Sequence, residues 1–309
     1  MAVPSLSPGA YRRVTLVATL ALAFIIVTGG AVRLTGSGLG CPEWPNCDDG
    51  RLVAPLEYHA MVEFVNRTVT GLVSLAVILA VLGSLLRRPR RRDLVWLSLG
   101  LVAGVVGQIV LGGLTVLFHL APPFVMGHFL LSIVLLTNAV VLHWRAGEPD
   151  GARPRPLVDA DLRRLGGLVV ATAALVVVLG TVVTAAGPHG GDEATPRLDV
   201  PLHRAAQVHG GAVVLLLVLV LVMLALMRQA GAPGDVRRRG AVLLAVLLAQ
   251  GAVGYAQYFT GVPVVLVGVH IAGAVAVWAA VVRFFVGLTG REAPSGREQP
   301  VRSGALAAA

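Results

Sequence analysis

Eight long apolar stretches constrain this chain more than any other feature of its sequence. Each is about 20 residues or longer, the length that an α-helix needs to cross the hydrocarbon core of a bilayer. Only 13% of the residues are charged, whereas about 25% are charged in soluble domains. The sequence therefore predicts an all-α integral membrane protein with eight transmembrane helices. The stretches are residues 14–33, 61–86, 94–117, 122–143, 165–185, 205–228, 240–259 and 263–287.

The distribution of positive charge predicts the orientation in the membrane. All 25 basic residues are arginine, and 20 of them lie in alternate connecting segments or near the two termini. The positive-inside rule places these segments and both termini in the cytoplasm, as in a multi-pass protein of a bacterial plasma membrane. The first stretch is long enough to span the bilayer, so we expect no cleaved signal peptide. A nucleic-acid partner would need a basic face on a soluble domain, and we expect none.

The chain also contains an internal repeat. Both halves hold four stretches in the same orientation, and polar residues recur in them with almost the same spacing. The pairs are Gln108/His128 and Gln250/His270, each 20 residues apart, and Asn66/His128 and His209/His270, 62 and 61 residues apart. This pattern predicts two pseudo-symmetric four-helix bundles related by an axis along the membrane normal. The expected parts are a cytoplasmic N-terminus (1–13), a first half (14–143), a cytoplasmic linker (144–164), a second half (165–287) and a disordered cytoplasmic tail (288–309).

Three histidines occupy the outer part of even-numbered stretches. Ionisable groups within a membrane are costly and indicate function, and neutral imidazole is a good ligand for haem iron in helix bundles. We expect His209 and His270 to be axial ligands of one haem in the second half, and His128 to be a ligand in the first. A packing role is the alternative for each histidine, but packing does not require the same spacing twice.

The first turns of the second stretch carry further polar residues. His59, Glu63 and Asn66 follow an i, i+4, i+7 pattern and share one helix face. Glu63 beside an apolar haem pocket could exchange protons near neutral pH, and the alternative is an ion pair with Arg67 at i+4. We expect His59 to lie further out, in water. The remaining histidines lie in or beside outer loops or at the cytoplasmic end, and are His119, His189, His203 and His143.

Both cysteines, Cys41 and Cys47, lie in the first outer loop. Because that side of the membrane is oxidising, we expect a disulfide between them. Two roles stay open at this point. The bond either holds the loop together or acts as a redox-active pair.

Several of these motifs resemble the haem A synthase family. The run GGAVRLTGSG from Gly29, followed by C-P-x-W-P-x-C, is similar to the opening signature of that family. The segments E-F-V-N-R-x-x-x-G and Q-x-x-L-G-G-L-T-V, which begin at Glu63 and Gln108, and the Gly-His starts of later stretches fit as well. The resemblance covers residues 14 to 287.

Members of this family are eight-span proteins that oxidise the C8 methyl of haem O to a formyl group, giving haem A for terminal oxidases. The resemblance implies a haem b cofactor between His209 and His270. It implies that the first half takes the substrate haem O, with His128 near its iron and Glu63 as the important acid. Implied partners are haem O synthase, oxidase assembly factors, membrane lipid and further copies of the chain. The haem propionates would pair with arginines near the outer face, such as Arg33, Arg67 or Arg204.

Two positions depart from the family pattern. Asn66 stands where the family usually has a histidine ligand, and an amide binds haem iron poorly. The haem of the first half is then five-coordinate through His128, or bound in another way. The second outer loop, residues 186–204, lacks the cysteine pair that some members have, so thiol chemistry would rest on Cys41 and Cys47 alone.

Two other functions are consistent with part of the sequence. A b-type electron-transfer cytochrome would explain the histidines but would give Glu63 no task. A transporter would place its polar residues near the middle of the spans, whereas here they gather toward the outer face. The enzyme accounts for the largest number of these features.

Overall fold

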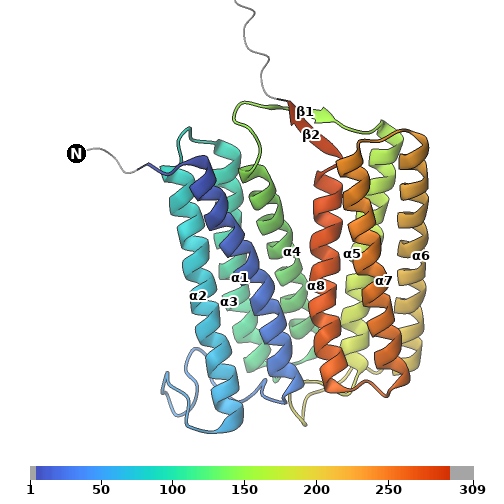
Figure 1. Ribbon diagram of the computed structural model, residues 1–309. Helices are drawn as coiled ribbons and strands as arrows, with labels where there is room; N and C mark the ends of the chain where they lie inside the picture. Colours follow the sequence, from blue (N-terminus) through green and yellow to red (C-terminus); the bar gives the residue numbers. More distant parts are fainter. Residues whose placement is uncertain (1–4, 293–309) are drawn as a thin grey trace, which may run out of the picture.

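A computed structural model describes residues 5–292 of the chain, and Figure 1 shows it as a bundle of long helices. All eight helices are long and apolar enough to cross a membrane. The all-α membrane architecture predicted from the sequence is therefore confirmed. The helices are α1 (Pro8–Leu34), α2 (Tyr58–Leu86), α3 (Arg92–Leu117), α4 (Pro122–Ala146), α5 (Ala160–Ala186), α6 (Leu202–Gln229), α7 (Gly234–Phe259) and α8 (Val264–Val286).

Local sequence fixes where some of these helices begin. The Ser7 hydroxyl accepts a hydrogen bond from the Ala10 N–H, and Pro8 follows as the first residue of α1. The Asp159 carboxylate caps α5 by accepting from the Leu162 N–H at 2.8 Å. Such caps satisfy backbone donors that the helix itself cannot pair, and proline suits the first helical position because it has no N–H to lose.

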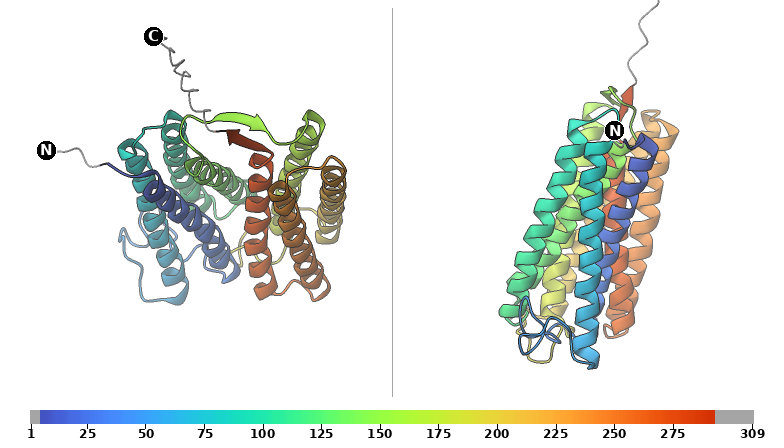
Figure 2. Two further views of the ribbon diagram at one scale, coloured as in Figure 1. Left: turned by 45° about the horizontal axis from the view of Figure 1, so that its top comes forward. Right: turned by 90° about the vertical axis from the view of Figure 1, so that its left-hand side faces the viewer.

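The helices form two four-membered bundles, as predicted. In the first bundle α1 packs on α2, α2 on α3, α3 on α4, and α4 on α1. The second bundle repeats this ring with α5, α6, α7 and α8. Figure 2 shows the two groups side by side. Helices α2 and α4 are thus diagonally opposite in one bundle, and α6 and α8 are diagonally opposite in the other.

The two bundles meet along α1, α4, α5 and α8. At this contact the Trp278 indole N–H of α8 donates to the Thr137 hydroxyl of α4 at 2.8 Å. Buried apolar side chains pack together at this contact, whereas many large apolar side chains on the outside of the molecule are exposed. An apolar exterior over an apolar interior is expected of helices that face lipid.

The end of the molecule that holds most arginines, called the arginine end below, also contains a short antiparallel sheet. Strand β1 (Arg153–Pro156) pairs with β2 (Thr289–Glu292), so the linker between the halves is tied to the segment after α8. The first residues of the tail that the sequence predicted to be disordered thus form a strand. Residues 293–309 of that tail lie outside the described part of the chain, as do residues 1–4 of the N-terminus.

Buried charge also stabilises the arginine end. The Arg87 side chain is only 1% exposed. It donates to the Asp150 carboxylate at 2.7 Å and to the Pro89 carbonyl. Leu6 pairs through its backbone with Leu86 and Arg88, which joins the start of the described chain to the end of α2.

Candidate functional site

The rings of His209 and His270 lie close together, edge to face, in the second bundle, at the end opposite the arginines. This end, called the cysteine end, carries the loops 35–57, 118–121, 187–201 and 260–263. The two ring centres are 6.5 Å apart and the ring planes are inclined by 71°. Because α6 and α8 are diagonally opposite, the pair reaches across the interior of the bundle.

A hydrogen bond to the backbone orients His209. Its Nδ1 lies 3.1 Å from the Val176 carbonyl oxygen of α5. A carbonyl can only accept, so Nδ1 carries the proton and Nε2 keeps a free lone pair. Histidines that bind metals commonly donate their second N–H to a carbonyl in this manner.

Glycines allow both rings to fit among the helices. A Cβ added at Gly180 would lie 3.2 Å from Cε1 of His209, and one at Gly254 would lie 3.0 Å from Cε1 of His270. Glycine at these two positions therefore provides the room that each ring occupies. The Gln250 amide donates to the His270 carbonyl oxygen at 2.9 Å and links α7 to α8.

The distance between the two rings fits a single bound metal ion. An imidazole nitrogen lies about 2.0 Å from such an ion and roughly 1.2 Å from its own ring centre, so opposed ligands have centres about 6.4 Å apart. The observed separation of 6.5 Å agrees with this value. Among residues 5–292, no group of three His, Cys, Asp or Glu side chains is arranged to hold a metal ion. Two opposed imidazoles without further ligands match the axial ligand set of a haem.

The first bundle repeats much of this environment around His128. A Cβ added at Gly112 would lie 3.3 Å from Cε1 of His128. Gly254 has the corresponding position beside His270. Gln108 donates to the His128 carbonyl oxygen at 3.1 Å and to the Ser132 hydroxyl at 2.7 Å. The equal spacings seen in the sequence thus correspond to equal contacts. Nδ1 of His128 and Nδ1 of His270 are both buried, and neither makes a hydrogen bond within the described chain.

Glu63 is buried near the start of α2, between the Arg67 side chain and the loop that contains Cys41. Its Oε1 accepts from Arg67 Nη2 at 2.6 Å and from Nε at 3.1 Å. Its Oε2 accepts from the Cys41 N–H at 2.8 Å. Both oxygens therefore accept hydrogen bonds, as in an ionised carboxylate. The ion pair with Arg67, which the sequence left as an alternative, is present in the structure.

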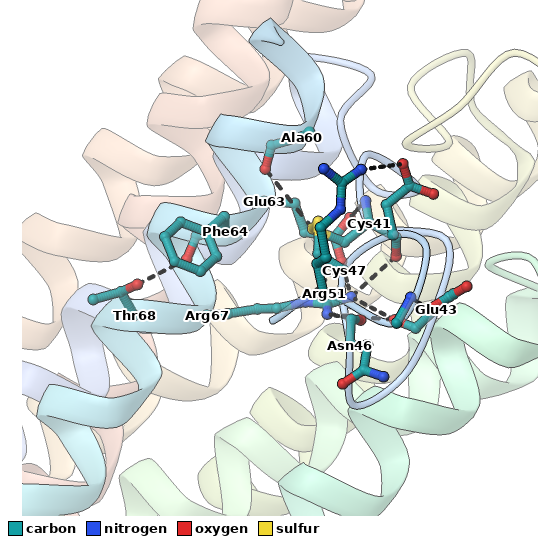
Figure 3. The surroundings of a disulfide bond; sticks show 12 residues. Cys41, Glu43, Asn46, Cys47, Arg51, Ala60, Glu63, Phe64, Arg67 and Thr68 are labelled. Atoms are coloured by element: carbon teal, nitrogen blue, oxygen red, sulfur yellow. Dashed lines mark hydrogen bonds and ion pairs between the residues drawn. A yellow bond between two sulfur atoms is a disulfide. The ribbon is translucent and has the colours of Figure 1, made fainter. Parts of the chain in front are cut away.

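Arg67 also anchors the loop that contains the cysteines, as Figure 3 shows. It donates to the carbonyl oxygens of Cys41, Glu43 and Asn46, and its guanidinium lies 5.2 Å from the centre of the Trp44 ring. Cys41 and Cys47 form a disulfide, which confirms the predicted bond, and both are buried. The disulfide loop is therefore bound directly to the carboxylate of Glu63.

The remaining predicted polar residues have different surroundings. His59 is exposed, as expected, and its Nδ1 lies 2.9 Å from the Ser37 hydroxyl. The side-chain oxygen of Asn66 is buried and accepts no hydrogen bond within the described chain. At the arginine end, His143 Nδ1 lies 3.1 Å from the Thr15 hydroxyl.

Sequence reasoning missed the contacts that join the loops of the cysteine end. His189, expected in water, is half-buried, and its Nε2 lies 2.8 Å from the Val262 carbonyl oxygen. Arg33 at the end of α1 donates to the His189 carbonyl at 2.6 Å and to the Thr184 carbonyl at 2.8 Å. These contacts connect α1 of the first bundle with the loops that flank α5 and α8. Each joins residues far apart in the chain, which no local pattern could show.

Two of the three arginines expected to meet haem propionates thus have partners within the protein. Arg33 is bound to carbonyl oxygens and Arg67 to Glu63. Arg204 is exposed, and its side chain has no hydrogen bond or ion pair to another described residue.

The fold and these residues define a class: a multi-pass helical membrane protein of two four-helix bundles, with half-buried imidazoles near one end of each. Comparison with known proteins is more specific. A family model described as cytochrome oxidase assembly protein (COX15-CtaA) matches residues 12–60 and 53–189. The haem A synthase of Symbiobacterium thermophilum is 32% identical over 262 residues, covering 79% of this chain and 84% of that protein.

Two further relatives match over shorter segments. The haem A synthases of Shewanella oneidensis and Exiguobacterium sibiricum are 30% and 28% identical over 189 and 171 residues. These segments cover 55% of this chain in each case and 53% and 57% of the relatives, so the match spans about half of their length. The chain belongs to the haem A synthase family, an oxidoreductase family that uses haem.

Proposed function

We propose that this protein is a haem A synthase, which oxidises the C8 methyl of haem O to a formyl group and yields haem A for terminal oxidases. The observation that carries the proposal is the opposed pair His209 and His270, 6.5 Å apart, together with the similar surroundings of His128 in the other bundle. Membership of a family whose relatives are named haem A synthase supports the same function.

In this proposal the second bundle holds the resident cofactor. His209 and His270 would hold the iron of haem b, and the Val176 carbonyl keeps His209 in the tautomer that leaves Nε2 free. Haem b, when bound, supplies one-electron redox chemistry. Gly180 and Gly254 leave the space in which the rings stand.

The first bundle binds haem O as the substrate. His128 would lie near its iron, and Glu63 would accept a proton as the methyl group is oxidised. Glu63 suits this task because its carboxylate is buried and oriented on both oxygens, by Arg67 and by the Cys41 N–H. Oriented groups of this kind contribute about 10²–10⁴-fold to rate. The disulfide loop keeps the Cys41 N–H in place.

We further propose that the arginine end faces the cytoplasm, with both termini inside, and that the cysteine end faces the oxidising side. In this account residues 14–143 and 165–287 form the substrate and cofactor halves, joined by the linker 144–164. The chemistry requires an enzyme that supplies haem O and an oxidase that receives haem A. Haem O synthase, oxidase assembly factors, membrane lipid and further copies of the chain are the proposed partners.

Identification of bound pigment tests the function. The full chain is expressed in cells that make haem O but lack their own haem A synthase, and extracted haems are identified by mass. The proposal predicts that haem A appears only when this chain is present. Recovery of haem b with unchanged haem O would instead indicate an electron-transfer cytochrome.

A further inference from the structure

Asn66 and His209 occupy equivalent positions in the two bundles. Asn66 lies near the start of α2, which is diagonally opposite α4, the helix of His128. His209 lies near the start of α6, which is diagonally opposite α8, the helix of His270. The chain separation from Asn66 to His128 is 62 residues, and that from His209 to His270 is 61. The second bundle has two imidazoles at these positions, whereas the first has one imidazole and one amide.

The immediate surroundings of His128 and His270 are otherwise closely alike. In both, a glutamine from the preceding helix donates to the histidine carbonyl, at 3.1 Å from Gln108 and 2.9 Å from Gln250. In both, a glycine of that helix lies against Cε1 of the ring. Asn66 is therefore the difference that bears on how a haem iron would be bound in the first bundle.

The Asn66 amide is available for a ligand. Its side-chain oxygen is buried and accepts no hydrogen bond within the described chain, which is uncommon for a buried polar atom. An amide is a much poorer ligand for iron than imidazole, which is a standard axial ligand of haem. It can, however, hydrogen-bond to a small polar molecule beside the iron.

We propose that Asn66 leaves one axial position of the first-half haem open to a small exogenous ligand, while His209 closes the equivalent position in the second half. This inference rests on the proposed function, because it assumes that both bundles bind haem. The two halves then divide the work. The second holds a haem with both axial positions filled by the protein, suited to electron transfer. The first holds the substrate with one exchangeable position, and the Asn66 amide next to it.

Exchanging the two residues between the halves tests this assignment. The purified full chain is loaded with haem b, then reduced and treated with carbon monoxide. We expect one haem of the wild-type protein to bind carbon monoxide, and the other, low-spin beforehand with both axial positions filled, not to react with it. Asn66→His should abolish carbon monoxide binding and add a second low-spin signal. His209→Asn should make the second half bind carbon monoxide as well.

Controls assign the signals to the two halves. His128→Ala should remove the carbon monoxide signal and leave the low-spin haem in place. A wild-type protein with two low-spin haems, or with haem only in the second half after loading, would overturn the inference. An Asn66→His variant that binds carbon monoxide as before would also overturn it. If that variant does not fold, the test rests on His209→Asn, and a second half that still fails to bind carbon monoxide in this variant would overturn the inference. A protein that binds no haem in either half would instead refute the proposed function.

Discussion

His209 and His270 come from diagonally opposite helices of one bundle, yet their ring centres lie 6.5 Å apart. Packing between neighbouring helices does not require two imidazoles to meet across a bundle interior. A metal ion held between them does.

Replacing Glu63 by glutamine should separate binding from chemistry. The amide keeps the size of the side chain but cannot serve as the proton acceptor proposed here. We expect the purified variant to keep its haem b spectrum and to form haem A at least about 100-fold more slowly, in line with the loss of an oriented acid or base. Haem extraction after expression with a haem O supply measures the rate. Wild-type formation of haem A would remove Glu63 from the mechanism.

Removing the disulfide should affect the first bundle more than the second. The double variant Cys41→Ser, Cys47→Ser frees the loop that donates to Glu63, and closing so short a loop stabilises a protein by about 2 kcal/mol. We expect a lower melting temperature in detergent and slower haem A formation, with the spectrum of the resident haem unchanged. A variant as active as the wild type would show that the loop does not position Glu63.

Gly254 and Gly251 provide a matched pair on α7. A Cβ at Gly254 would lie 3.0 Å from Cε1 of His270, whereas a Cβ at Gly251 would have no neighbour within 4 Å. Overpacking a site costs typically about 1–3 kcal/mol, or roughly five-fold to more than 100-fold in affinity. We expect Gly254→Ala to weaken retention of haem b by that factor and Gly251→Ala to leave it unchanged. Equal retention in both variants would contradict the placement of His270.

Fusions to alkaline phosphatase, an enzyme that requires disulfides and is active only outside the cytoplasm, test the proposed orientation. We expect active fusions when it is joined within loop 187–201 at the cysteine end, and inactive fusions within the 87–91 turn at the arginine end. The opposite pattern would place the imidazole pair near the cytoplasmic face and refute the topology.

The sequence predicted the helices well because hydrophobic length is a local property. The second and third stretches, 61–86 and 94–117, correspond to helices at Tyr58–Leu86 and Arg92–Leu117. The first helix begins at Pro8 rather than residue 14, because Arg12 and Arg13 end the apolar run although the helix continues through them. The disulfide and the family could also be predicted, because both depend on motifs that are contiguous in the chain.

Contacts between distant segments could not be predicted. Strand β1 has the sequence Arg-Pro-Arg-Pro, which no propensity favours as a strand, and it forms only because β2 pairs with it. Arg33 offered a plausible partner for a propionate, but in the folded chain it is bound to carbonyl oxygens of the second half. Which arginine has a free side chain depends on tertiary structure, and Arg204 fits that description here.

The most direct test of the account is the low-spin haem signal of the purified protein, measured by electron paramagnetic resonance in four forms. We predict that the wild type and His128→Ala show a signal typical of two axial imidazoles, and that His209→Ala and His270→Ala both lack it. A normal low-spin signal in either of the last two variants, or a colourless wild-type protein from cells replete in haem, would contradict the claim that these two histidines hold the iron.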